Sequence, residues 1–238
     1  MKAGAKRKVA VFDIDGTIFR SSLLIELVES LIAAGIFPEK VRRDYVRAHR
    51  AWLDRQDSYE KYIWAVVVAF EKNIKGVGEA DFLRVVRQVA RLEEQRVYRF
   101  TRDLVRDLKK KNYFLLAISH SPKYIVDDFA RQWGFDKVYG RLLELDRRKK
   151  FTGAGFFTEL ISDKAKILAR AVAKENLTLR GSVGVGDTES DINFLARVAR
   201  PICFNPNQAL YREARKRGWP VVVERKDVIY KIQRKDTE

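Results

Sequence analysis

The sequence predicts an α/β fold: a parallel sheet covered by helices, with a helical unit inserted after the first strand. Three observations support it. Short apolar runs rich in β-branched residues alternate with helical patterns in the second part of the chain, and such runs are typical of strands buried on both faces. Residues 20–97 show helical spacing only. Polar residues follow several of the apolar runs, at the sheet edge where ligands bind.

Five apolar runs are the predicted strands, at residues 9–14, 113–119, 182–187, 201–205 and 220–224. Helical patterns separate them, at residues 101–111, 122–134, 162–176 and 190–199. This alternation of strand and helix is typical of a parallel sheet. Residues 137–158 interrupt it, and we expect a strand and a small hairpin there, around Gly153 and Gly155. We expect the charged tail, residues 225–238, to pack loosely.

Between the first two strands the apolar residues recur at helical spacing. They form three groups, which run from Leu23 to Leu31, from Tyr59 to Phe70 and from Phe82 to Val89. Pro38 and the glycines at 76 and 78 separate the groups. We therefore predict a helical domain at residues 20–97 and a core domain made of residues 1–19 and 98–238.

The composition is that of a folded chain in a reducing compartment. Of the 238 residues 46% are hydrophobic, which is enough for a sizeable core. The single cysteine, Cys203, excludes an internal disulfide framework. No apolar run is long enough to cross a bilayer, and the basic N-terminal segment does not resemble a signal peptide. We expect a cytoplasmic monomer or homodimer with no membrane partner.

The net charge of +16 allows two interpretations. Such a charge attracts anions and can support nucleic-acid binding. The basic residues are spread widely, however, as on the polar faces of helices. Attraction of a phosphorylated substrate needs only the local field. A nucleic-acid partner is therefore the weaker hypothesis, and a non-catalytic polyanion-binding protein is kept as an alternative function.

Polar side chains follow three of the predicted strands, in the segments 13–17 (DIDGT), 119–121 (SHS) and 186–191 (GDTESD). If these strands are neighbours, several acids and a hydroxyl meet in one crevice. Clustered carboxylates repel one another unless a cation joins them, and oxygen ligands of this kind suit Mg²⁺. Lys164 and Lys166, which open a helix before the third strand, could balance further charge.

These segments resemble the motifs of the haloacid dehalogenase-like (HAD) hydrolase superfamily. DIDGT resembles its DxDxT motif, AISHSP the strand ending in Ser or Thr, Lys164 in SDKAKIL the lysine motif, and GDTESD the motif GDxxxD. The resemblance runs from about residue 9 to residue 224. The insertion resembles the helical cap of the phosphoserine-phosphatase-like subgroup. The resemblance implies a HAD-type Rossmann-like core and a Mg²⁺-dependent phosphatase that hydrolyses a small phosphorylated metabolite.

The resemblance also implies roles for the residues of the first two motifs. Asp13 would be the nucleophile that forms an aspartyl-phosphate and would also bind the metal. Asp15 would be the general acid and then base, with its backbone carbonyl on the metal. Gly16 would permit the following turn and bind phosphate. Ser119 would hold a phosphate oxygen; Ser121 is a rival, and Ser119 is favoured because it directly follows the apolar run.

In the remaining motifs, Lys164 would bind phosphate, and its neighbour Lys166 would face solvent. Asp187 would bind the metal directly. Asp191 would bind it through water or orient the lysine, and it would also suit a helix N-terminus. Of the two histidines, His120 is expected at the pocket rim and His49 on the solvated cap surface.

The substrate is less well defined by the resemblance. Phosphoserine phosphatases hold the serine amine with a glutamate and its carboxylate with a cap arginine. Here the glutamate position falls on or near Ser22, with Glu26 one turn later, and Trp64 stands near the arginine position. Arg55 and Lys61 are possible substitutes. These departures disfavour phosphoserine. Tyr59, Tyr62 and Trp64 could line an apolar pocket, although core packing is the expectation for most of them, and a phosphotransferase remains an alternative activity.

Overall fold

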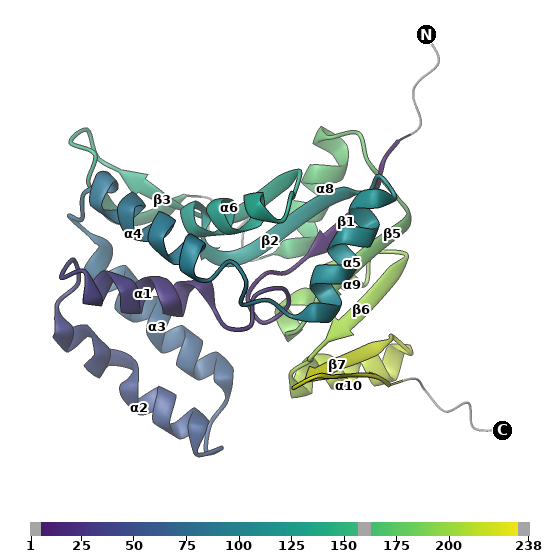
Figure 1. Cartoon of the computed structure of the whole chain (residues 1–238), viewed down its shortest axis with the longest axis horizontal. Coiled ribbons are helices and arrows are strands. Elements are labelled where there is room, and N and C mark those ends of the chain that lie inside the picture. The colour runs from purple at the N-terminus through teal and green to yellow at the C-terminus, as the bar shows by residue number, and fades with distance from the viewer. Residues whose placement is uncertain (1–5, 157–162, 233–238) are drawn as a thin grey trace, which may run out of the picture.

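A computed structural model describes residues 6–156 and 163–232. Within these ranges eight strands form one sheet in the order β4-β3-β2-β1-β5-β6-β7-β8 (Figure 1). The strands are β1 (Lys8–Phe12), β2 (Phe114–Pro122), β3 (Lys137–Leu145), β4 (Phe151–Phe156), β5 (Thr178–Gly186), β6 (Arg200–Phe204), β7 (Val221–Arg225) and β8 (Val228–Ile232). All five predicted strands are present, and the α/β fold class is confirmed.

The first strand lies in the middle of the parallel part of the sheet. β1 pairs in parallel with β2 on one side and β5 on the other, and Val11 faces Leu116 and Gly184 across the two pairings. Among the eight strands of the described residues, only the outer pairs, β3 with β4 and β7 with β8, are antiparallel. The residues that directly follow β1, β2 and β5 therefore meet at one edge of the sheet.

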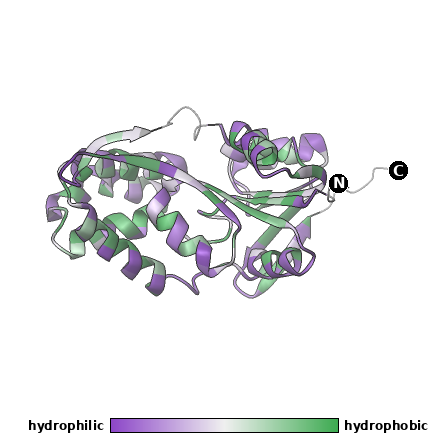
Figure 2. Cartoon of the chain, turned by 90° about the horizontal axis from the view of Figure 1, so that it is seen from above, coloured by the Kyte–Doolittle hydropathy of each residue, from purple (hydrophilic) through white to green (hydrophobic). Residues whose placement is uncertain are grey.

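Helices cover both faces of the sheet: α5 (Arg99–Lys110), α6 (Lys123–Gln132), α8 (Lys164–Lys174), α9 (Ile192–Leu195) and α10 (Gln208–Arg217). Alternate β1 side chains enter two apolar clusters, Ala10 and Phe12 in one, Val9 and Val11 in the other, as the period of two in a strand requires. Figure 2 shows the apolar residues concentrated along the inner strands. The predicted helix at 190–199 is shorter than expected, because the chain turns into β6 at Arg200.

The segment between β1 and α5 is helical, as predicted. It contains α1 (Leu23–Ala33), a 3₁₀ turn η1 (Glu39–Val41), α2 (Arg42–Leu53), α3 (Tyr59–Ile74) and α4 (Glu79–Leu92). Where the chain enters and leaves this helical unit, Phe19 and Val97 form an antiparallel bridge. We propose the domain boundary at this pair, in agreement with the prediction of 20–97. No helix in the described ranges is long and apolar enough to cross a membrane.

A second connection joins the helical unit to the sheet. β3 and β4 form a hairpin whose turn lies at residues 146–150, so Gly153 and Gly155, where the hairpin was predicted, lie inside β4 instead. The hairpin reaches the loop between α3 and α4. Gly76 N donates to Phe151 O (2.8 Å), Phe151 N to Val77 O (3.0 Å) and Glu79 N to Lys149 O (2.9 Å). The Phe151 ring packs edge-on against Phe82 at 4.8 Å. The hairpin, assigned to the core by sequence, thus contacts both parts of the molecule.

The described part of the tail forms a strand that was not predicted, although its side chains are mostly exposed, as loose packing implies. β8 pairs along its length with β7, from Val221 opposite Ile232 to Arg225 opposite Val228. The turn between them is formed by Lys226, with φ of 53°, and Asp227. Such a turn usually carries glycine or asparagine, so the sequence shows no strong hairpin signal. Residues 233–238 of the predicted tail lie outside the described residues.

The hairpin contact predicts a large effect on stability. Phe151 is 2% exposed, and Phe151→Ala would leave a cavity between the hairpin and α4, lowering the free energy of unfolding by about 3–5 kcal/mol. Urea denaturation measures this. Leu92→Ala, at a side chain that is 70% exposed on the same helical unit, is the control and should change stability by no more than about 0.5 kcal/mol. Equal effects of the two substitutions would contradict a structural role for the hairpin contact.

Candidate active site

Asp13 is placed by the end of the central strand. It directly follows β1, and its backbone N–H donates to Val185 O of β5 (3.0 Å), so the backbone is held by the neighbouring strand. The side chain is 6% exposed. A carboxylate removed from water in this way needs a paired cation or a metal ion.

Lys164 supplies that cation. It is the first residue of α8, whose N-terminus is capped by the Asp163 side chain. The lysine is 2% exposed, and its Nζ donates to Asp13 Oδ1 and, at 2.6 Å, to Asp191 Oδ1. Burial opposes the charge on Lys164, but the carboxylates of Asp13 and Asp191 outweigh it and hold its pKa above the usual value. Lys166 has 69% of its side chain exposed and only a long contact to Asp163.

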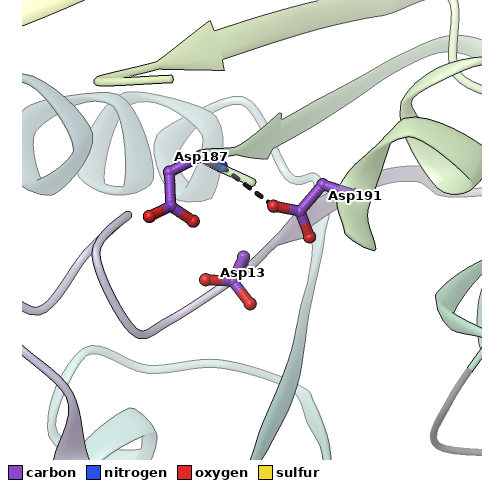
Figure 3. A group of neighbouring side chains, drawn as sticks. All are labelled: Asp13, Asp187 and Asp191. Atoms are coloured by element: carbon purple, nitrogen blue, oxygen red, sulfur yellow. Dashed lines mark hydrogen bonds between the residues drawn. The ribbon is translucent and has the colours of Figure 1, made fainter. Parts of the chain in front are cut away.

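Three carboxylates converge beside this lysine. Asp13, Asp187 and Asp191 offer oxygen atoms that all lie within 4.8 Å of one another. Figure 3 shows the three side chains grouped together, Asp13 and Asp187 from the ends of strands and Asp191 from the helical turn that follows β5. Burial, opposed by the charge of Lys164, raises the pKa of Asp13 to about 8. Burial and the charge of Asp13 raise the pKa of Asp187 well above its usual value. This surplus of buried negative charge, on oxygen donors alone, fits a hard divalent cation such as Mg²⁺.

The loop after β5 orients Asp191. It turns through η2 (Glu189–Asp191), and Asp191 Oδ2 accepts from the N–H groups of Asp187 (2.9 Å) and Thr188 (3.0 Å). Asp191 therefore holds the backbone of the turn through Oδ2 and pairs with Lys164 through Oδ1. The contact with the lysine and the contact at a helix start, both expected for Asp191 from the sequence, are present together.

Gly16 makes room for Asp187. Its φ is 78°, and a Cβ at this position would lie 2.1 Å from Asp187 Oδ2. The N–H of Gly16 is directed to Phe19 O and Ser21 O, at 3.0 Å each. A phosphate-binding role for Gly16 thus stays a prediction, whereas the geometry requires a residue without a side chain. Thr17, the last residue of the DIDGT segment, donates through Oγ1 to Asp187 Oδ1 (3.2 Å).

Asp15 connects the second strand to the helical unit. Its Oδ2 accepts from Ser119 Oγ (2.6 Å) and Ser121 Oγ (2.9 Å), and its Oδ1 accepts from Leu23 N (2.6 Å) at the start of α1. Both serines contact the same carboxylate, so this geometry does not distinguish between them. Phosphate binding by Ser119 stays a prediction. His120, between them, is exposed.

The predicted substrate-recognition positions are scattered. Ser22 is buried and Glu26 pairs with Arg96 (2.7 Å). Lys61 pairs with Asp57 and is largely exposed, and Arg55 is exposed as well. None of these contacts reaches the acid cluster.

The aromatic residues of the helical unit differ from expectation in two places. Trp64 is 65% exposed and does not pack into the core. His49, expected in solvent, stacks on Tyr62 with ring centroids 4.6 Å apart. Tyr62 itself is buried, as core packing requires. Because α2 is rich in arginine, its sequence gave no indication of this aromatic cluster.

Comparison with known proteins places the chain in a family. The family model described as haloacid dehalogenase-like hydrolase matches residues 10–196, and the chain belongs to this family. It is 25% identical to a phosphoserine phosphatase of Archaeoglobus fulgidus over 86% of the chain and 54% of that protein, so it spans about half of that relative. It is 23% identical to a histidinol-phosphatase of Neisseria meningitidis, over 91% of the chain and 98% of the relative.

Solved structures share the fold. A Bordetella pertussis protein of unknown function has a TM-score of 0.71 at 19% identity, covering 91% of this chain and 98% of that one. A phosphoserine phosphatase described as a phospho-aspartyl intermediate analogue has a TM-score of 0.60 at 18% identity, covering 94% and 96%. These likenesses extend over the sheet and the helical unit together.

The ion-pair geometry makes a prediction for the metal-free protein. Lys164→Met leaves Asp13 and Asp191 buried without a cation, which should lower the free energy of unfolding by about 3–5 kcal/mol. This loss of stability should become smaller as pH falls toward 4. The buried carboxyl groups of the folded variant bind protons at pKa values above those of the unfolded chain, so low pH favours the folded state. Urea denaturation in chelator at several pH values measures both effects.

Lys166→Met is the matched control, since it removes the same charge from the same helix at an exposed position. It should change stability by about 0.5 kcal/mol or less at every pH. A Lys164→Met deficit that is small, or that does not depend on pH, would show that the lysine does not compensate the buried acids.

Proposed function

We propose that the protein is a Mg²⁺-dependent phosphatase that hydrolyses a small phosphate monoester through an aspartyl-phosphate on Asp13. The observation that carries this proposal is the group of Asp13, Asp187 and Asp191 around Lys164, in which Asp187 is partly exposed and the other three residues are buried. Membership of a hydrolase family and the names of the relatives, phosphoserine phosphatase and histidinol-phosphatase, support phosphate-ester chemistry.

In the first step a carboxylate oxygen of Asp13 attacks phosphorus, and the bond between phosphorus and the ester oxygen breaks. The leaving oxygen takes a proton from Asp15, two residues further along the chain. Lys164 donates a hydrogen bond to Asp13. Its positive charge therefore lies beside the position that the phosphoryl group would occupy. The hydroxyls of Ser119 and Ser121 donate to Asp15 before substrate binds. We expect them to donate to phosphate oxygens instead when the ester is bound.

In the second step Asp15, now a carboxylate, takes a proton from water as the water oxygen attacks phosphorus. The bond from phosphorus to Asp13 breaks, which releases inorganic phosphate and restores the Asp13 carboxylate. Asp15 is thus acid and then base in turn, and its position next to the start of α1 puts this proton transfer at the boundary with the helical unit.

The metal would be held by Asp13, Asp187 and the backbone carbonyl of Asp15, with Asp191 acting through water or through Lys164. When bound, Mg²⁺ supplies positive charge that masks the phosphate and lowers its repulsion of the Asp13 carboxylate. The raised pKa values of Asp13 and Asp187 support this assignment, because both acids carry their charge more easily beside a cation.

The role of Asp13 is tested by phosphate release from p-nitrophenyl phosphate, with Mg²⁺ and with chelator, for wild type and Asp13→Asn. Wild type should need Mg²⁺, and the variant should lose activity by about 10⁴-fold or more because no carboxylate remains to attack. Lys164 keeps Asp191 as a partner in this variant, so the fold should be retained. Residual turnover in Asp13→Asn near the wild-type rate would contradict the nucleophile assignment.

The role of Asp15 has its own signature. Asp15→Asn should lower kcat by roughly 10²–10⁴-fold for an alkyl phosphate, whose leaving oxygen must be protonated. For p-nitrophenyl phosphate, whose leaving group departs as a stable anion, the first step should slow much less. A burst of p-nitrophenol measures that step separately. Equal losses in the first step for both substrates would argue against general acid catalysis.

A phosphotransferase would share the first step and differ only in the group that attacks the phospho-enzyme. Adding an alcohol such as glycerol to the assay separates the two activities. A hydrolase should release inorganic phosphate in an amount equal to that of the leaving group of the substrate. A deficit of phosphate, matched by the appearance of glycerol phosphate, would identify transfer.

A further inference from the structure

The last strand of the sheet has one edge without a neighbouring strand. Among the described residues β8 ends the strand order, so only β7 pairs with it. The two strands pair in a regular register over all five residues of β8. Edge strands are usually protected by charged side chains, proline or bulges, whereas β8 carries a single charged residue, Lys231. Figure 1 shows this end of the sheet, with β7 and α10, on the side away from the helical unit.

Three side chains of β8 form an apolar stripe on one face of this edge. Val228, Tyr230 and Ile232 alternate along the strand and are 44%, 53% and 37% exposed. Tyr230 lies opposite Val223 of β7, and Ile232 lies opposite Val221. Val221 belongs to the apolar cluster that α10 covers, and side chains of opposite residues point to the same face. The stripe therefore continues that face of the sheet beyond the cover of α10.

Exposed apolar side chains of this size are concentrated at this edge. Seven large hydrophobic side chains are exposed in the described part of the chain, and four of them lie on β8 and α10, the fourth being Tyr211. The others, Leu53, Trp64 and Leu92, are spread over the helical unit. Single exposed residues are normal, whereas grouped ones mark an interaction site. The sequence after Ile232, QRKDTE, has no apolar side chain that could cover the stripe.

The hairpin geometry determines which backbone groups of β8 are free. Arg225 and Val228 close a two-residue turn. Val228 and every second residue after it therefore exchange hydrogen bonds with β7. The N–H and C=O groups of Ile229 and Lys231 are directed to the open edge instead. Another strand is the partner that satisfies a row of such groups.

The sequence of β8 and its turn is complementary to a second copy of itself. In an antiparallel pair centred on Ile229, this residue lies opposite its own copy, Val228 opposite Tyr230, and Asp227 opposite Lys231. Pairs of an aromatic with a β-branched residue, and pairs of opposite charge, stabilise neighbouring strands. Twofold symmetry makes each of these pairs occur twice.

The charged pair favours this register over its neighbour. Asp227 and Lys231 are exposed, and neither side chain forms an ion pair within the described residues. Arg99 Nη2 donates to the backbone carbonyl of Asp227 (2.9 Å), which holds the turn and leaves the carboxylate free. A pair centred on Tyr230 would place Lys231 opposite Ile229 and leave both charges without a partner.

We propose that β8 is an interaction surface for a second copy of this chain, and that two copies form a symmetric dimer through antiparallel β8 strands centred on Ile229. The two sheets would join into one, with the apolar stripes side by side on the face that α10 covers. The inference is independent of the proposed phosphatase function, because β8 lies three strands from β5, the nearer of the strands that carry the acids.

Sedimentation velocity tests for the dimer. An interface of one strand from each copy is small, so the dimer should be weak and is sought between about 5 and 500 μM. Salt at about 0.15 M limits the repulsion between two chains of charge +16 to about 8 Å. Wild type should change from monomer to dimer over this range. A chain that stays monomeric at the highest concentration would overturn the inference.

The apolar stripe is tested by Tyr230→Lys, which places a charge opposite Val228 of the other copy. It should raise the dissociation constant of the dimer at least about tenfold. Trp64→Lys is the matched control, because this side chain is 65% exposed on the helical unit, and it should leave the dissociation constant unchanged. A dimer that survives Tyr230→Lys, or that is weakened equally by both substitutions, would place the contact elsewhere and overturn the inference.

The register is tested by two charge reversals. Asp227→Lys and Lys231→Glu each place like charges opposite one another, so each variant alone should dimerise at least about tenfold more weakly than wild type. An equal mixture of the two variants should dimerise as wild type does, because every new charge then faces an opposite charge on the other chain. A urea midpoint equal to that of wild type checks that each variant is folded. Failure of the mixture to restore the dimer would overturn the proposed pairing.

Discussion

The buried ammonium of Lys164 is the contact on which the candidate site depends. It joins Asp13, at the end of β1, to Asp191, in the loop after β5. Without a cation, burial would protonate these acids or drive them apart. One lysine cannot neutralise Asp13, Asp187 and Asp191 together, and the remaining negative charge explains why the site suits a divalent cation. The pairing of β1 with β5 brings the acids together, and the first turn of α8 brings the lysine.

The chemistry and the position of the helical unit depend on the same residues. Asp15, the proposed acid and base, accepts hydrogen bonds from two serines in the last residues of β2 and from the first N–H of α1. The hairpin of β3 and β4 binds the opposite part of the helical unit through Phe151. Movement of the unit relative to the core would therefore act on Asp15 directly, and the hairpin limits the directions in which such movement can occur.

The fold could be predicted where the local signal was strong. The runs that became β1, β2 and β5 are continuous and apolar because both their faces are buried, and Pro38 and Gly76 mark real breaks between helices. The sequence pattern failed to predict structure that depends on contacts with other segments of the chain. β8 is an exposed edge strand with a turn of lysine and aspartate, so only its pairing with β7 makes it a strand. The stacking of His49 on Tyr62 depends on two helices meeting.

The candidate site divides in the same way. The sequence alone determined which acids and which lysine stand at strand ends and helix starts, because spacing along one strand or one turn is a local property. Only the tertiary structure decided that Gly16 must lack a side chain to admit Asp187, that both Ser119 and Ser121 reach Asp15, and that Trp64 is exposed. Those relations join segments far apart in the chain, and the packing of the helical unit against the sheet sets the distances between them.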